Sequence, residues 1–257
     1  MNEWNRRAFL RTLGGAGALG AFPTLAHAAD LLGSDAVTIS ILHTTDIHGH
    51  ILPLTDYDGT PDVGGLARCV TQIRRWRRNN RNTVLVDVGD VYQGTDVGWR
   101  SKGQLMIDLF NHLKYDAWVI GNHEFDWGME PFVQAVHASK MPVLAANTTI
   151  EGAAPGTMSD ATHPLARMRP FFLKEIQGIR LAIIGVTTPG MPFWFRPEYL
   201  RGLDFNYPVE SVRRAIREAK TAGAHAIVLA GHMGLKGRAG GDDFANNVLS
   251  PNAPRRP

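Results

Sequence analysis

The feature of this sequence that most constrains its fold is a series of apolar, β-branched runs that each end in residues able to bind metal. The first run, Val37 to Leu42, is followed by Asp46-Ile47-His48. Such a run predicts a buried strand, and residues two apart on an extended chain point the same way. We therefore expect Asp46 and His48 to converge on one ion. Carboxylate oxygen beside imidazole nitrogen suits zinc, manganese or iron better than calcium.

Three later runs end in the same manner. They are Val84 to Val88 before Gly89-Asp90, Tyr115 to Ile120 before Gly121-Asn122-His123, and residues 225–230 before Gly231-His232. In open α/β sheets, ligand sites gather outside the carboxyl ends of the strands. A single Asp-x-His pair can arise by chance, but the ordered set predicts one shared site.

The spacing of apolar residues predicts helices between these strands, at 66–77, 104–113, 129–139 and 209–222. Strands and helices that alternate are typical of a layered α/β domain. Two apolar runs, 170–176 and 179–186, flank Gln177-Gly178, a two-residue connection typical of a hairpin. The hairpin argues for a mixed sheet.

An aromatic stretch, Phe193-Trp194-Phe195 with Tyr199, follows this hairpin. Exposed rings would suit stacking on a substrate base, whereas buried rings would cover the sheet. Burial is the commoner fate of such side chains.

The N-terminus carries the pattern of an export signal. Paired Arg6-Arg7 precede Phe9-Leu10, a weakly apolar stretch and the small-residue site Ala26-His27-Ala28. Residues 1–28 resemble a twin-arginine signal peptide, which predicts the twin-arginine export machinery as a partner and a bacterial periplasmic or secreted location. We expect no stable membrane anchor, because the apolar run is well short of about 20 residues and contains Pro23.

Charge gives no indication of a nucleic-acid partner. Loss of three arginines and one glutamate with residues 1–28 lowers the formal net charge from +3 to +1. The arginines at 74–81 fall in the last turns of a predicted helix, where they face the helix dipole and solvent. The single cysteine, Cys69, excludes an intrachain disulfide and lies on an apolar helix face, so we interpret it as a packing thiol.

The order of these motifs resembles the calcineurin-like metallophosphoesterase superfamily, whose pattern is Asp-x-His, Gly-Asp, Gly-Asn-His-Glu/Asp and Gly-His. The stretches Leu42 to His50, Gly89 to Thr95 and Gly121 to Asp126 are most similar to its 5′-nucleotidase branch. The resemblance implies an α/β fold, an αββα sandwich of two mixed β-sheets flanked by helices, over residues 29–249.

The resemblance also implies roles for individual residues. Asp46 and His48 would hold one divalent metal ion, Asp90 would bridge two, and Asn122 and His232 would hold the second. His123 would be a catalytic residue over the phosphate, oriented by Asp126, and Asn122 and His123 would contact the substrate. The implied cofactors are two zinc, manganese or iron ions, and the implied substrate is a nucleotide or other small phosphate ester. Glu124 is expected to support its loop by hydrogen bonds.

The sequence departs from the family pattern after His232. The family continues to a Gly-His-x-His turn, which this sequence does not contain, and residues 250–257 form a Pro/Arg tail. We therefore expect the last strand to be missing, each metal to lack one histidine, and phosphatase activity to be low. The alternatives are a catalytically incomplete metal- or phosphate-binding remnant and a relative of the thiosulfohydrolases.

Overall fold

The computed structural model describes residues 36–55, 58–152 and 162–234. The chain divides into two units, residues 1–38 and 39–257, and every helix and strand given below belongs to the second. The predicted signal at 1–28 and the predicted tail at 250–257 lie outside the described residues. Within the described residues, none of the helices combines the length and the apolarity that crossing a bilayer requires.

The larger sheet has five strands in the order β1-β2-β3-β4-β6, and all four of its pairs are parallel. The strands are β1 (Ser40–Thr44), β2 (Thr83–Asp87), β3 (Ala117–Val119), β4 (Val143–Leu144) and β6 (Met168–Arg169). Parallel strands bring their carboxyl ends to one edge of the sheet. The polar residues that follow β1, β2 and β3 therefore gather at that edge, as the sequence predicts.

The second sheet is the mixed one, with the order β10-β8-β7. It contains β7 (Phe171–Ile176), β8 (Ile179–Thr187) and β10 (Ala226–His232). The predicted hairpin is confirmed, because β7 pairs antiparallel with β8. Its turn residues Gln177 and Gly178 have φ of 48° and 79°, the signs of a type I′ turn. β10 pairs parallel with β8 and extends two residues beyond the predicted strand end, so His232 is its last residue. A third, two-stranded sheet pairs β5 (Thr148–Ile150) with β9 (Leu203–Phe205).

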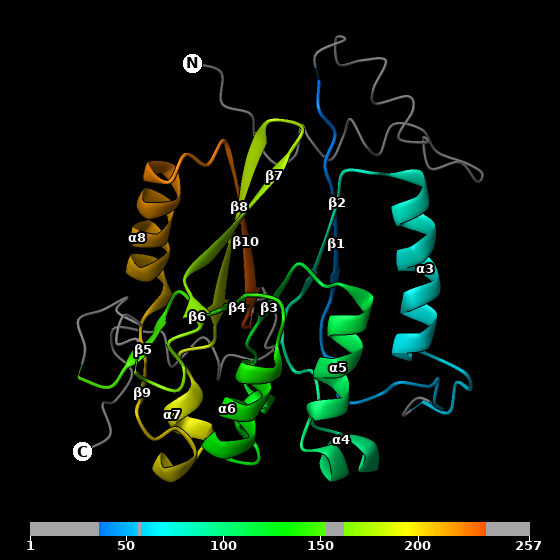
Figure 1. Cartoon of the computed structure of the whole chain (residues 1–257). Helices are drawn as coiled ribbons and strands as arrows, with labels where there is room; N and C mark the ends of the chain where they lie inside the picture. The colour runs from blue at the N-terminus through cyan, green and yellow to red at the C-terminus, as the bar shows by residue number, and fades with distance from the viewer. Residues whose placement is uncertain (1–35, 56–57, 153–161, 235–257) are drawn as a thin grey trace. The chain divides into compact units, whose positions relative to one another are not determined.

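Helices lie on both sides of the paired sheets (Figure 1). The helices that connect strands of the larger sheet are α3 (Leu66–Asn79), α4 (Asp96–Ser101), α5 (Gln104–Leu113) and α6 (Met129–Ala138). The long helix α8 (Pro208–Thr221) lies beside the mixed sheet, and three short elements complete the described chain: η1 (His123–Phe125), α7 (Met191–Trp194) and η2 (Pro197–Tyr199).

The described core consists of three apolar clusters, two of which lie on opposite faces of the larger sheet. On β2, Leu85 packs under the helices with residues such as Phe110 and Phe132, whereas Val84 and Val86 pack between the sheets against Leu181 and Ile183 of β8. Successive residues of a strand point to opposite faces, which is how one strand serves two layers. A third cluster joins β8 to α8. The layers are helix, sheet, sheet and helix, so the predicted αββα sandwich is confirmed. Only the smaller of its two sheets is mixed in the described residues, whereas two mixed sheets were predicted.

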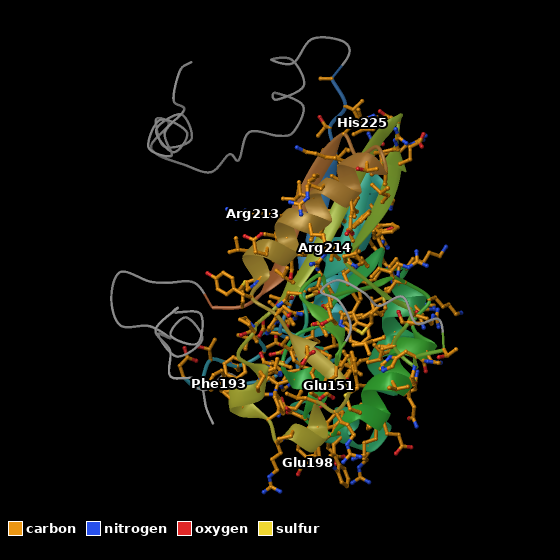
Figure 2. The ribbon with its side chains drawn as sticks, turned by 90° about the vertical axis from the view of Figure 1, so that its left-hand side faces the viewer. Glu151, Phe193, Glu198, Arg213, Arg214 and His225 are labelled. Carbon is orange, nitrogen blue, oxygen red and sulfur yellow. The ribbon has the colours of Figure 1, made fainter. Side chains whose placement is uncertain are left out.

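The aromatic stretch is divided between the two predicted environments. Phe195 packs against the main core and its ring lies 6.5 Å from that of Phe125. Trp194 and Tyr199 are 39% and 38% exposed. This region, marked by Phe193 and Glu198 in Figure 2, lies at the opposite end of the fold from His225, which directly precedes β10. His225 directly precedes β10 and His232 ends it, so the two histidines lie at opposite ends of that strand.

Candidate metal centre

Three strand ends bring four of the five predicted metal-binding residues together. Asp46 and His48 follow β1, Asp90 follows β2, and His232 ends β10. The centre therefore draws on both sheets, although Asp90 and His232 are 142 positions apart in the numbering.

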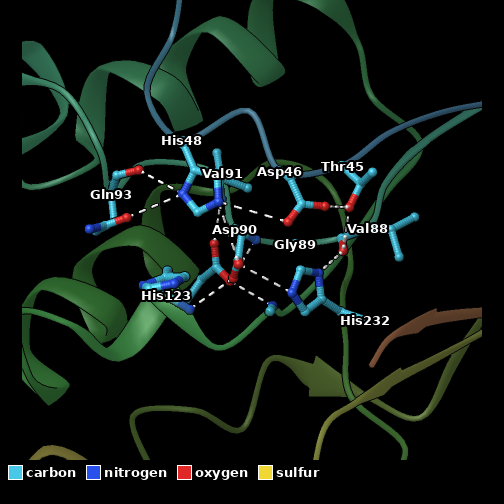
Figure 3. Close-up of polar contacts among 12 residues, drawn as sticks. Thr45, Asp46, His48, Val88, Gly89, Asp90, Val91, Gln93, His123 and His232 are labelled. Carbon is cyan, nitrogen blue, oxygen red and sulfur yellow. Dashed lines mark hydrogen bonds and ion pairs between the residues drawn. The ribbon is translucent and has the colours of Figure 1, made fainter. Parts of the chain in front are cut away.

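Asp90 lies at the middle of this group (Figure 3). Its Oδ2 atom is 3.7 Å from His48 Nε2 and 3.2 Å from His232 Nε2. His48 Nε2 is also 3.8 Å from Asp46 Oδ1, and Asp46, His48 and Asp90 each offer a ligand atom within 4.8 Å of the others. The Asp90 side chain is 4% exposed and that of Asp46 is 53% exposed. The carboxylate between the histidines is therefore buried, while Asp46 faces solvent.

Both histidines present the same nitrogen to the centre. His48 Nδ1 lies 3.0 Å from the Gln93 carbonyl and 3.2 Å from Gln93 Oε1, and His232 Nδ1 lies 2.6 Å from the Val88 carbonyl. Since a carbonyl can only accept, Nδ1 donates in each case and the neutral ring keeps its Nε2 lone pair for a metal. The contacts of Gln93 and Val88 were not predicted. Gln93 lies within the family-like stretch Gly89 to Thr95, whereas a backbone carbonyl such as that of Val88 leaves no signal in a sequence.

The ligand turns adopt unusual backbone conformations. Asp46, His48 and Asp90 have φ of 52°, 49° and 58°, a left-handed region that costs non-glycine residues about 1–2 kcal/mol each. Such strain clusters at functional sites. Backbone hydrogen bonds hold the two turns together, because Asp46 N and His48 N donate to the carbonyls of Gly89 and Asp90 at 3.0 and 2.9 Å.

Glycine is required where β2 and β3 end. A Cβ atom on Gly89 would lie 2.5 Å from the Gly121 nitrogen and 3.0 Å from His232 Nδ1, and Gly89 has a φ of 93°. Only a residue without a side chain permits this approach. The Gly-Asp and Gly-Asn-His stretches are therefore in direct backbone contact.

Glu124 fastens these same two stretches from within the core. Its carboxylate is almost fully buried and accepts hydrogen bonds from the amides of Asp90, Val91 and Gly121 at 3.1, 2.7 and 2.5 Å. Burial, together with the charge of Asp90, raises the pKa of Glu124 to about 7. Its contacts agree with the expected role in supporting the loop.

His123 and Asp126 form a hydrogen-bonded pair beside the centre. His123 Nδ1 is 2.8 Å from Asp126 Oδ2, and this bond raises the pKa of His123 above its usual value. The His123 amide donates to Asp90 Oδ1 at 2.8 Å, and its ring lies 5.2 Å from that of His48. The His123 side chain is 36% exposed, so it is open to a ligand. Asn122, half-buried, directly precedes it.

The electrostatics of the centre favour a positive charge. Burial alone would raise the pKa of Asp90, but its hydrogen bond and charge interaction with His232 leave this pKa below its usual value. Burial opposes protonation of His232, yet Asp90 raises the His232 pKa to about 9. A divalent cation would supply that charge, and the donor set of carboxylate oxygens and imidazole Nε2 atoms fits zinc, manganese or iron.

Comparison with known proteins relates the chain to phosphoesterases. Residues 39–254 match the calcineurin-like phosphoesterase family. A snake venom 5′-nucleotidase from Naja atra is 34% identical over 206 residues, which are 77% of this chain and 37% of the relative. The trifunctional nucleotide phosphoesterase YfkN of Bacillus subtilis is 29% identical over 88% of this chain and 16% of its own length.

A solved structure has the same arrangement of elements. The 5′-nucleotidase precursor from Thermus thermophilus superposes with a TM-score of 0.65 at 30% identity, over 76% of this chain and 37% of that one. The chain thus spans little more than a third of the length of the snake venom and Thermus proteins.

Proposed function

The chain belongs to the calcineurin-like phosphoesterase family, and on this basis we propose that it is a metal-dependent hydrolase of phosphoric ester bonds with nucleotide-type substrates. The observation that carries the proposal is the position of Asp90, whose Oδ2 atom lies between His48 Nε2 and His232 Nε2. A carboxylate so placed would be able to contact two ions. Nucleotide 5′-monophosphates and cyclic nucleotides are the proposed substrates.

The proposed ligands divide into two groups around Asp90. Asp46 and His48 would hold one ion, Asn122 and His232 would hold the other, and Asp90 would contact both. Divalent ions held there would lower the pKa of a water molecule and polarise the phosphoryl oxygens of the substrate. The hydrogen bonds of His48 to Gln93 and of His232 to Val88 support this assignment, because they leave both Nε2 atoms facing Asp90.

His123 is the proposed acid beside the phosphate. Asp126 holds its Nδ1–H at 2.8 Å, which orients the ring and stabilises its protonated form. Nε2 can then donate a hydrogen bond to a phosphoryl oxygen or a proton to the leaving alkoxide. Asn122, the residue before it, would contact the same phosphoryl group.

Phosphate release by the purified 257-residue chain tests the activity. The protein is stripped with a chelator, reloaded with Mn²⁺ or Zn²⁺, and assayed with nucleoside monophosphates, cyclic nucleotides and a thiosulfonate substrate. We expect nucleotide hydrolysis that Asp90→Ala abolishes and that Asp108→Asn, at an exposed position on α5, leaves unchanged.

The other outcomes of this assay separate the alternatives. Metal binding without turnover of any substrate would identify the catalytically incomplete remnant. Turnover of the thiosulfonate alone would identify the thiosulfohydrolase-like activity. Hydrolysis that persists in Asp90→Ala would exclude the centre described here.

We also propose export to the periplasm by the twin-arginine machinery, on the basis of the sequence of residues 1–28. A fusion to a reporter that is active only after export would test this. Export should stop when Arg6 and Arg7 are both replaced by lysine, and an unaffected fusion would contradict the proposal.

A further inference from the structure

A third buried carboxylate, Asp87, lies beneath the centre and has no part in the chemistry proposed above. It is the last residue of β2 and is fully buried. Its Oδ1 atom accepts a hydrogen bond from the Gly89 amide at 2.9 Å, and its Oδ2 atom accepts one from the Thr44 hydroxyl at 2.6 Å. Because both oxygens are engaged, the side chain has a single fixed orientation.

The first of these bonds fixes the turn that carries Asp90. A carboxylate that accepts from the amide two residues on forms an Asx-turn, and here it holds Gly89 at a φ of 93° directly before Asp90 at 58°. The amides of Asp90 and Val91 are bound by Glu124, and the carbonyls of residues 89–91 accept from the loop at 46–49. Glu124 does not bind the Gly89 amide, and Asp87 supplies the acceptor for it.

The second bond extends to the other ligand loop. Thr44 ends β1 two residues before Asp46 and is the register partner of Asp87 in the parallel pair. Its hydroxyl also lies 3.0 Å from that of Tyr115, which is itself buried. Asp87 thus connects the ends of β1 and β2, the two strands that lead into the turns of Asp46 and Asp90.

We propose that Asp87 is a positioning residue for the metal centre, which sets the orientation of Asp90 through its hydrogen bond to the Gly89 amide. The inference rests on the proposed metal-dependent function, but concerns a residue outside the proposed ligand set. Residues behind a ligand typically change metal affinity about 10–100-fold when they are removed.

Mn²⁺ binding to the full chain, measured by electron paramagnetic resonance, tests this independently of turnover. Three variants separate positioning from general stability. Asp87→Asn keeps the acceptor for Gly89 and can donate to Thr44, whereas Asp87→Ala removes both bonds. Thr44→Val keeps the bond to Gly89 but removes the bond to Thr44 and, with it, the contact of Thr44 with Tyr115. Melting temperature and circular dichroism are measured for each, so that a loss of affinity can be separated from a loss of fold.

We expect Asp87→Ala to weaken Mn²⁺ binding at least about tenfold, with Asp87→Asn and Thr44→Val within about threefold of the wild type. Unchanged Mn²⁺ affinity in folded Asp87→Ala would overturn this inference but not the proposed function. The same conclusion would follow if Asp87→Asn or Thr44→Val lost as much affinity as Asp87→Ala. Failure of the wild-type chain to bind Mn²⁺ would overturn both this inference and the proposed function.

A measurement on the wild-type protein covers the case in which Asp87→Ala does not fold. The Gly89 amide should exchange slowly with solvent in the wild type and in Asp87→Asn, because its acceptor is retained in both. Exchange at the rate of an unprotected peptide in the folded protein would overturn the inference.

Discussion

At the scale of single residues, the centre depends on side chains that are held by their neighbours before any metal binds. Asp90 is buried and is fixed through its backbone by Glu124 and through Oδ1 by the His123 amide. His48 and His232 are each oriented by a carbonyl. Pre-organised ligands reduce the cost of ordering the site when it is occupied. The residues outside the ligand set therefore matter as much to the chemistry as those within it.

The pairing of His123 with Asp126 leads to a prediction that depends on the leaving group. Replacing His123 by alanine should lower kcat about 10²–10⁴-fold with a nucleoside monophosphate, since that range is typical of general acid catalysis. The loss should be much smaller with p-nitrophenyl phosphate, whose leaving group needs no proton. Steady-state kinetics with both substrates and Mn²⁺ binding provide the measurements.

Mn²⁺ affinity should change little in His123→Ala, because the histidine is not a proposed ligand. His112→Ala, at an exposed position on α5, serves as the matched control. An equal loss of kcat with both substrates would argue against proton donation by His123.

The close approach at Gly89 predicts a large cost for one added methyl group. In Gly89→Ala the new Cβ atom would meet Gly121 N at 2.5 Å and the backbone would be strained at a φ of 93°. We expect a loss of roughly 3 kcal/mol or more in the free energy of unfolding, which combines strain with overpacking. Urea denaturation measures it.

Gly178→Ala is the control for backbone strain alone. Gly178 has a φ of 79° but nothing within 4 Å of an added Cβ atom. The free energy of unfolding should therefore fall by only about 1–2 kcal/mol. Equal losses in the two variants would show that the contact between Gly89 and Gly121 is looser than described.

At the scale of elements, the hairpin between β7 and β8 is a place where the sequence is not optimal for its structure. Gln177 occupies a left-handed conformation, with a φ of 48°, that asparagine tolerates better and that Asn-Gly turns favour. Gln177→Asn should therefore raise the free energy of unfolding by about 0.5 kcal/mol, as measured by thermal or urea denaturation.

The same replacement in a helix should have the opposite sign. Gln72 is exposed on α3, where asparagine has the lower helix propensity by a few tenths of a kcal/mol. Destabilisation by Gln177→Asn would contradict the turn assignment, and stabilisation by Gln72→Asn would contradict its use as a helical control.

At the scale of the whole described fold, the proposed centre joins the two sheets. Asp90 follows β2 of the larger sheet and His232 ends β10 of the mixed sheet, with 3.2 Å between Oδ2 and Nε2. Metal bound to both residues would link the ends of two layers that pack against each other through a cluster of apolar side chains.

We therefore expect Mn²⁺ to stabilise both sheets together. At a free concentration 100 times Kd, binding to the native state alone contributes about 2.7 kcal/mol. Hydrogen exchange should slow in β10 as well as in the loop at 46–49, and the rise in melting temperature should disappear in Asp90→Ala. Protection confined to the loop at 46–49 would exclude His232 as a ligand.

Much of the fold follows from local patterns. The strand at 84–88, the helix at 104–113 and the hairpin at 170–186 were predicted within one or two residues of β2, α5 and the β7–β8 pair. Hydrophobic period and turn residues are local properties, so one segment is enough to recognise them. The clustering of the carboxyl ends of the strands also follows, because parallel pairing requires it.

Local sequence is thus sufficient for the layered α/β class and for the residue types at the strand ends, but not for which atoms meet there. The roles of Gln93, Val88 and Asp87 depend on a carbonyl or carboxylate that comes within about 3 Å of a residue on another strand or turn. Such distances are set by the way strands and sheets pair and pack, including the register of β1 on β2, and by the left-handed turns at Asp46 and Asp90. Neither is encoded in the spacing of residues along a single segment, so these contacts became visible only in three dimensions.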